Sequence, residues 1–326
     1  MDTNALLSHQ HEESILSRSS ERFHFHITDV DLRRMYEEHF ELFWTPKEVN
    51  PSADLGDWEK LTDAERAFIS HVLAFFAAAD GIVFENIQCN FGNEVTIPEA
   101  RFFYGFQGMI ENVHSETYMK ILQTYISDES EQERLIHAVT TIPSIKMKAE
   151  WAMRYLDSSL PFALRLIAFA VVEGIFFSGS FCAIFWLKSQ RPGMLEALTF
   201  SNQLIARDEG LHTAFAVALF HRLRNKPTQK LVHDIVSSAV EIETIFTLGA
   251  LQVSLIGMTA ESMSQHIRFV ADRLLRQLGY DTLYNVSDPF SFMEAQSLRV
   301  TTNFFEGKVA EYALAPEGQF ALDAEF

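Results

Sequence analysis

Two segments of the chain repeat the pattern Glu-x-x-His. The first holds Glu111 and His114, and the second holds Glu209 and His212. On a helix, side chains three positions apart lie on one face, so each pair could bind a single ion. One such pair carries little information, because glutamate and histidine often fall three residues apart by chance. The repetition of the pattern is what indicates a site.

A carboxylate inside an apolar segment precedes each copy of the pattern. Asp80 ends the apolar run 72–79 and lies 31 residues before the first copy. Glu173 lies within the apolar stretch 166–187, 36 residues before the second copy. Buried carboxylates are stable only when they are paired or bound to metal, and four of them in one core would repel one another. We therefore expect cations where they meet.

Two divalent metal ions would neutralise the four carboxylates, because neutral imidazoles add no charge. Mixed oxygen and imidazole ligands suit iron or manganese, whereas a zinc site more often uses sulfur. Helix bundles that hold two such ions use this arrangement of carboxylates and Glu-x-x-His pairs. The alternative, structural carboxylates paired with Lys or Arg, explains the apolar surroundings poorly. The predicted metal ligands are Asp80, Glu111, His114, Glu173, Glu209 and His212.

The second copy of the pattern contains an additional candidate ligand. Asp208 lies four residues before His212, so helical spacing alone also allows it as the ligand. The parallel with the first copy favours Glu209, because Ile110 occupies the position that matches Asp208. Asp208 is then expected to orient a ligand histidine from outside the metal site.

A tyrosine is expected close to the predicted metal site. Tyr118 follows His114 by four residues on the same helix face, which is a rise of about 6 Å. Three apolar side chains also fall on the ligand-bearing faces, at four or eight residues from a ligand. Core packing explains any one of them, but together they suggest a redox tyrosine protected from water. These pocket residues are Phe177, Phe181 and Ile205.

Helical periodicity dominates the elements that must position these residues, so the fold class is all-α. Thr62 and Glu65 form a helix-start signal, and Pro98 suits the first turn of another helix. Residues 1–20 are polar and without periodicity, which predicts a disordered leader, and 21–305 are expected to form one helical domain. A strand is conceivable only at short segments such as 23–27. The expected helices span 31–43, 61–89, 98–125, 129–139, 144–157, 162–187, 194–224, 227–254, 259–278 and 287–305.

The composition excludes several other classes of protein. The net charge of −18 argues against a nucleic-acid-binding groove, which needs a basic face. The two cysteines, Cys89 and Cys182, cannot form a disulfide framework, and residues 1–22 contain no apolar signal segment. The stretch 166–187 is long enough to cross a bilayer, but Glu173 within it argues for a buried core helix. We expect a cytoplasmic protein without membrane or nucleic-acid partners.

The C-terminal end breaks the helical pattern. Residues 315–319 contain Pro316 and Gly318 and cannot continue a helix, and the chain then ends in FALDAEF, from Phe320 to Phe326. The composition alone favours a solvated end. The alternative is a peptide that folds onto a partner, with its two phenylalanines as anchors.

Several segments together resemble the small, radical-bearing subunit of class I ribonucleotide reductase. They are ADGIV at 79–83, IENVHSE at 110–116, VEGIFFSGSF at 172–181 and RDEGLH at 207–212. The resemblance extends from about residue 22 to the end, and FWT at 43–45 and the FALDAEF end resemble the eukaryotic and viral branch. It implies a ferritin-like helical bundle with a di-metal carboxylate site in its core and additional C-terminal helices.

The resemblance also implies a role for each matching residue. The six predicted ligands would bind two iron ions, with a mixed manganese and iron cofactor less expected. Tyr118 would be oxidised to a stable tyrosyl radical when the di-iron(II) site reduces dioxygen; the irons give two electrons, Tyr118 one and an outside donor one. Trp44, Asp208 and His114 resemble the path of electron and proton transfer to the surface. Tyr312 resembles the tail tyrosine that relays the radical.

The partners follow from the same resemblance. The chain would be half of a ribonucleoside-diphosphate reductase, which supplies deoxyribonucleotides for DNA replication. Its large subunit would bind the flexible tail 306–326 through Phe320–Phe326, and the small subunit would be a homodimer. Two isolated cysteines do not offer the thiyl radical and reducing dithiol of the family's mechanism, so the substrate would bind the large subunit.

Two other functions share part of this pattern. A related di-metal oxidase or oxygenase would keep the ligands, but would not need Trp44, Tyr118, Tyr312 and the FALDAEF end together. A non-catalytic iron-binding or iron-storage bundle needs neither the C-terminal helices nor the tail. A purely structural bundle leaves the buried carboxylates unexplained.

Overall fold

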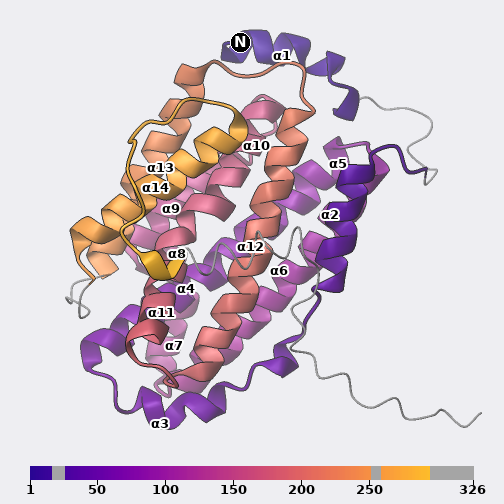
Figure 1. Cartoon of the computed structure of the whole chain (residues 1–326). Helices are drawn as coiled ribbons and strands as arrows, with labels where there is room; N and C mark the ends of the chain where they lie inside the picture. The colour runs from indigo at the N-terminus through magenta and orange to yellow at the C-terminus, as the bar shows by residue number, and fades with distance from the viewer. Residues whose placement is uncertain (17–25, 251–257, 294–326) are drawn as a thin grey trace, which may run out of the picture.

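The computed structural model describes residues 1–16, 26–250 and 258–293 (Figure 1). Within these residues all regular structure is helical and no strand occurs, which confirms the all-α prediction. The longer helices are α2 (Val30–Glu41), α4 (Asp63–Asn86), α6 (Pro98–Tyr125), α9 (Pro143–Arg154), α10 (Phe162–Val171), α11 (Ser178–Gln190), α12 (Glu196–His221), α13 (Gln229–Ala250) and α14 (Ala260–Leu278). The shorter helices are α1 (Thr3–His9), α3 (Leu55–Trp58), α5 (Gly92–Glu94), α7 (Glu129–Ile136) and α8 (Ala138–Thr141).

Tighter and wider helical turns connect these elements. The 3₁₀ turns are η1 (Gln10–Glu12), η2 (Ser14–Leu16), η4 (Pro46–Glu48) and η5 (Pro51–Asp54). Two π-helical segments, η6 (Ile87–Phe91) and η7 (Val172–Phe176), continue α4 and α10. The sequence predicts continuous helices here, and η7 divides the expected helix 162–187 into α10 and α11. A π turn adds one residue to the helical turn and is often found at functional sites.

The residues that the sequence predicts at the beginnings of two helices occupy those positions in the structure. The Thr62 hydroxyl accepts a hydrogen bond from the Glu65 amide, and the Glu65 carboxylate accepts one from the Thr62 amide at 2.8 Å. Pro98 occupies the first turn of α6, whose observed bounds are those predicted. These local signals place the helices that carry the first Glu-x-x-His pair and Asp80.

The core of the bundle lies between the longest helices. Helix α4 packs along α6, α10 packs along α12, and α2 covers α6 from outside (Figure 1). Helices α13 and α14 pack on each other beside this core, and are the additional C-terminal helices expected after α12. Two helical segments are long and apolar enough to cross a membrane, Asp63–Glu94 and Phe162–Gln190, but their most apolar windows are 61% and 94% buried. They are helices of the protein core.

The prediction of a disordered leader is wrong for residues 1–16. Asp2 caps α1 by accepting a hydrogen bond from the Ala5 amide, and the side chains of Leu6 and Ile15 are buried. The Glu13 carboxylate accepts hydrogen bonds from the backbone amides of residues 224 and 225, both at 2.8 Å. Because these partners are more than two hundred residues away, the local composition could not reveal them.

Several predictions fall outside the described residues. These are most of the expected strand 23–27 and most of the expected helix 287–305. The predicted domain boundaries at residues 21 and 305, Tyr312 and the tail 306–326 also lie outside them. They stay predictions.

Candidate metal centre

The six predicted ligands lie together in the bundle core. Helix α4 supplies Asp80, α6 supplies Glu111 and His114, η7 supplies Glu173, and α12 supplies the second Glu-x-x-His pair. Each of the six residues is at most 2% exposed. They form two groups of possible ligand atoms that share Glu111; within each group the atoms lie within 4.8 Å of one another. One group is Asp80, Glu111 and His114, and the other is Glu111, Glu173, Glu209 and His212.

Two glutamates lie between the two histidines. Glu111 places Oε2 3.4 Å from Nδ1 of His114 and Oε1 3.2 Å from Nδ1 of His212. Glu209 places Oε1 3.1 Å from Nδ1 of His114 and Oε2 3.0 Å from Nδ1 of His212. Glu111, which belongs to both groups, and Glu209, which is close to both histidines, are therefore placed to contact two ions, whereas Asp80 and Glu173 are placed to contact one.

The cluster contains buried polar atoms that no protein group satisfies. Among the described residues, neither Asp80 oxygen has a hydrogen-bond partner, and the same holds for one oxygen each of Glu111, Glu173 and Glu209 and for Nδ1 of His114. A buried polar group without a partner is destabilising by about 1–3 kcal/mol, more when it is charged. Two divalent cations would satisfy these atoms and neutralise the four carboxylates, so the residues fit a di-metal site.

Burial and mutual repulsion shift the ionisation of the cluster. Burial raises the pKa of the Asp80, Glu111 and Glu173 carboxyls, and nearby carboxylates raise it further. Burial disfavours the imidazolium of His114, but the surrounding carboxylates, led by Asp208, raise its pKa well above the ordinary value. Protons and metal ions therefore compete for these ligands.

Asp208 lies outside the ligand group, where it contacts the other side of His114. Its Oδ2 is 3.1 Å from Nε2 of His114 and accepts a hydrogen bond of 2.7 Å from the indole Nε1 of Trp44. The Trp44 ring also stacks on the imidazole of His114, with ring centroids 5.9 Å apart. Burial alone would raise the pKa of Asp208, but the adjacent Arg207 guanidinium and His114 hold it at about 2. Asp208 and Glu209 were the two candidate ligands in the second Glu-x-x-His segment, and of these Glu209 is the one that faces the cluster.

Tyr118 is buried on α6, one helical turn beyond His114. Its phenol oxygen has no hydrogen-bond partner among the described residues, and burial together with the Asp80 carboxylate raises its pKa well above the ordinary value. Phe76 stacks on the ring at 4.7 Å, and the predicted pocket residues Phe177 and Phe181 pack on Phe76 at 5.5 and 5.0 Å. Ile205 is fully buried. Tyr118 is thus buried, and the aromatic ring stacked on it belongs to a cluster of apolar side chains.

Three residues near the cluster were not predicted from the sequence. Phe76 and Gln107 each lie four residues before a ligand, a spacing that could have indicated them. The Gln107 amide donates to Oε1 of Glu111 at 3.2 Å and to Oε1 of Glu173 at 3.3 Å. His39 of α2 approaches His212 across 173 positions of sequence, so no local spacing indicates it. Burial lowers the pKa of His39 well below its ordinary value.

Comparison with known proteins identifies the family. A family model described as ribonucleotide reductase, small chain, matches residues 22–289. The ribonucleoside-diphosphate reductase small subunit of Dictyostelium discoideum is 54% identical over 303 residues, covering 92% of this chain and 89% of that protein. The ribonucleoside-diphosphate reductase small chain of vaccinia virus (strain Western Reserve) is 50% identical over 320 residues, covering 96% of this chain and 100% of that protein. Eukaryotic and viral relatives are thus both found, as the resemblance implied.

The fold agrees with a solved structure of the same family. The ribonucleotide reductase Rnr4 homodimer from Saccharomyces cerevisiae superimposes with a TM-score of 0.82 at 33% identity, covering 92% of this chain and 96% of that chain. This likeness and the buried cluster of carboxylates and histidines confirm the predicted ferritin-like bundle. The chain belongs to the family of ribonucleotide reductase small chains, which are subunits of an oxidoreductase.

Proposed function

We propose that this chain binds two iron ions in its core and generates a stable radical on Tyr118 for use by the large subunit of a ribonucleoside-diphosphate reductase. The observation that carries the proposal is the position of Tyr118. Its buried phenol lies one helical turn from His114. Nδ1 of His114 faces a cluster of buried carboxylates, several of whose oxygens have no hydrogen-bond partner among the described residues.

The residues of the chain have distinct tasks in this proposal. Glu111 and Glu209 lie between the two histidines and would be shared by the two ions, Asp80 and Glu173 would each hold one ion, and the two histidines would bind through Nδ1. Two iron ions bound there and reacting with dioxygen would supply the oxidising equivalent that takes an electron from Tyr118. The Tyr118 proton would leave in the same step, because one-electron oxidation makes the phenol strongly acidic and burial disfavours a charged ring; the carboxylate of Asp80, the charge that acts most strongly on the phenol, would accept it.

The surroundings of Tyr118 favour a long-lived radical. The rings of Phe76, Phe177 and Phe181 exclude water and offer no group that is easily oxidised. Among the residues that the structure describes, the phenol oxygen has no hydrogen-bond donor that could return a proton directly. These features explain why an oxidised Tyr118 would persist until an electron arrives by a defined path.

That path begins at Trp44, Asp208 and His114, which form a continuous series of contacts from the end of α2 to the cluster. We propose that electrons and protons pass along it, and that Tyr312 continues it to the large subunit. The tail residues Phe320–Phe326 would bind that subunit. Substrate would bind there too, since Cys182 is buried and Cys89 is exposed on a different helix.

The remaining parts of the proposal rest on the relatives. Proteins named ribonucleoside-diphosphate reductase small chain match nearly the whole of this chain, and the related yeast structure is described as a homodimer. We propose that this chain also forms a homodimer and acts in the cytoplasm. Two irons, rather than iron with manganese, are proposed because a tyrosine is available at position 118 to carry the radical.

One experiment tests the metal, the radical and the residue together. The apoprotein is loaded with Fe(II) without oxygen, air is admitted, and an electron paramagnetic resonance (EPR) spectrum is recorded for the native chain and for Tyr118→Phe. We expect a tyrosyl signal that the variant lacks, with equal iron content in both proteins. Iron oxidation without a radical would favour a di-metal oxidase or a mixed-metal cofactor, and absence of iron uptake would contradict the metal site.

A further inference from the structure

His39 lies directly behind one of the two proposed histidine ligands. It is on α2, is 1% exposed, and its Nε2 is 3.3 Å from Nε2 of His212. The two rings are 4.9 Å apart with an interplanar angle of 63°. The other sides of His39 are apolar, because Phe103 and Phe106 lie 5.1 and 4.7 Å from its ring.

The orientation of His212 determines which nitrogen carries the proton. Nδ1 of His212 faces Glu111, Glu209 and Glu173, at 3.2, 3.0 and 3.7 Å. A neutral imidazole that binds metal through Nδ1 carries its hydrogen on Nε2. Nε2 of His212 therefore donates, and Nε2 of His39 accepts.

The two proposed histidine ligands thus have different outer partners. His114 donates from Nε2 to Asp208, a carboxylate, whereas His212 donates to the imidazole of His39. A carboxylate partner makes a ligand histidine more basic than a neutral partner does, and such outer contacts also fix the ring orientation. The two metal positions therefore differ, although their inner ligands are similar.

We propose that His39 is a positioning residue that holds His212 with Nδ1 toward the cluster and so sets the affinity of one of the two metal positions. The inference rests on the proposed di-metal site and extends it to a residue outside the ligand set. It predicts that a change at His39 affects the metal ion held by His212 and spares the ion held by His114.

The first test measures binding of Mn(II) alone to the apoprotein, from the EPR signal of free Mn(II). We expect the native chain to bind two ions. His39→Leu should weaken one of them by about 10- to 100-fold, the range observed when an outer partner of a ligand histidine is lost. His39→Gln should recover most of the loss, because its amide can accept the same hydrogen bond. Phe106→Leu, a packing change beside the same ring, should leave both affinities as they are.

The second test locates the weakened ion. In a His212→Ala background, His39→Leu should cause no additional loss of affinity, because the ring that it orients is gone. In a His114→Ala background a loss caused by His39→Leu should remain, because the His212 ring that His39 orients is still present. The circular dichroism spectrum of each variant checks that the bundle is folded.

The outcomes separate the inference from the proposed function. Absence of Mn(II) binding by the native chain overturns the metal site and the inference with it. Two ions bound equally well by the native chain and His39→Leu overturn the inference alone, and so does an equal loss in His39→Gln or Phe106→Leu. If His39→Leu fails to fold, His39→Met replaces it in the two alanine backgrounds, because Met also removes the imidazole acceptor; its effect must then be present with His212 and absent in His212→Ala.

Discussion

At the scale of residues, the candidate metal centre consists of carboxylates and histidines surrounded by apolar side chains. Asp80 and Glu173 interrupt apolar stretches, and a carboxylate in such a place needs a partner. The contacts that orient these ligands differ in how far the sequence indicates them. Gln107 shares a helix with Glu111, but His39 meets His212 only when α2 packs against α6 and α12. Spacing in the sequence reveals contacts within a helix and misses contacts between helices.

Trp44 allows a test of the proposed transfer path. In Trp44→Phe an aromatic ring remains beside His114, but the hydrogen bond to Asp208 is lost. A hydrogen bond to a charged group contributes about 1.5–3 kcal/mol, so we expect turnover with the large subunit to fall by at least about tenfold. Iron content and the amount of Tyr118 radical in the isolated chain should stay close to native once an external reductant is supplied. Unchanged turnover would contradict the path.

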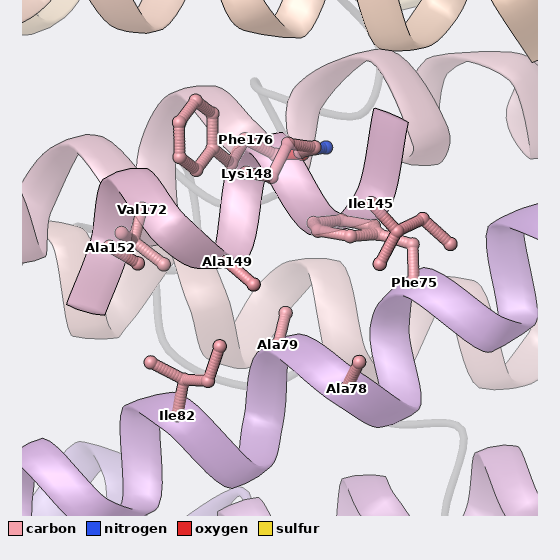
Figure 2. A pocket seen from close by; sticks show the side chains of 10 residues that line it. All are labelled: Phe75, Ala78, Ala79, Ile82, Ile145, Lys148, Ala149, Ala152, Val172 and Phe176. Atoms are coloured by element: carbon pink, nitrogen blue, oxygen red, sulfur yellow. The ribbon is translucent and has the colours of Figure 1, made fainter. Parts of the chain in front are cut away.

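At the scale of elements, regular helices were predictable and irregular ones were not. Helix α6 has the bounds that Pro98 and its periodicity predict. The segment 162–187 is apolar on all sides, so its pattern contains no register from which a π turn could be recognised. What stabilises η7 comes from other helices: Nζ of Lys148, on α9, donates to the carbonyl oxygen of Phe176 at 2.6 Å. Figure 2 shows Lys148 beside Phe176 and Phe75, at the edge of an apolar pocket between α4, α9 and η7.

A buried ion pair holds this lysine in place. Nζ of Lys148 is 2.6 Å from Oε2 of Glu243 on α13, and both side chains are at most 1% exposed. Glu243 also approaches α11 closely at Gly179, where an added Cβ would lie 2.6 Å from Oε1 of Glu243. The pair therefore links α9, α11 and α13 to the π-helical segment that carries Glu173.

We predict that the two halves of this pair are strongly coupled. Lys148→Met leaves Glu243 buried without a partner and should lower the free energy of unfolding by about 3–5 kcal/mol. The double variant Lys148→Met, Glu243→Leu should regain most of that loss, because apolar side chains can replace a buried pair. Urea unfolding of native, single and double variants measures this. Equal effects of the single and double variants would contradict the coupling.

The Lys148–Glu243 pair also makes the free energy of unfolding depend on pH. Burial raises the pKa of Glu243 from 4.5 to about 7 and lowers that of Lys148 from 10.5 to about 8. Between pH 4.5 and 7 the folded state binds more protons than the unfolded chain, so the contribution of Glu243 to stability falls as pH rises. Above pH 8 the unfolded chain binds more protons, so the contribution of Lys148 rises again. The stability of the double variant relative to native should therefore be greatest near pH 7–8.

At the scale of the whole molecule, the architecture buries the proposed radical residue away from solvent. Tyr118 and the cluster of carboxylates and histidines lie inside the bundle. The chain as a whole carries a net charge of −18. Sequence patterns predicted this class and its core, because burial leaves a strong signal in long helices. They did not predict the ordering of residues 1–16, since those residues are held by the distant turn that follows α12. A radical generated in such a core must reach its partner through specific contacts at the surface.

The C-terminal residues 320–326 are the proposed contact with that partner. The segment carries two phenylalanines, Phe320 and Phe326, and burial of one such side chain stabilises binding by about 1.5–3 kcal/mol. Deleting the segment should therefore weaken binding of the large subunit by at least about 100-fold and abolish nucleotide reduction at ordinary concentrations. Iron content and the Tyr118 EPR signal of the isolated chain should not change, because the predicted ligands and Tyr118 lie on α4, α6, η7 and α12. Phe326→Ala alone should give part of the loss and Asp323→Asn much less, whereas native affinity after the deletion would place the docking surface elsewhere on the bundle.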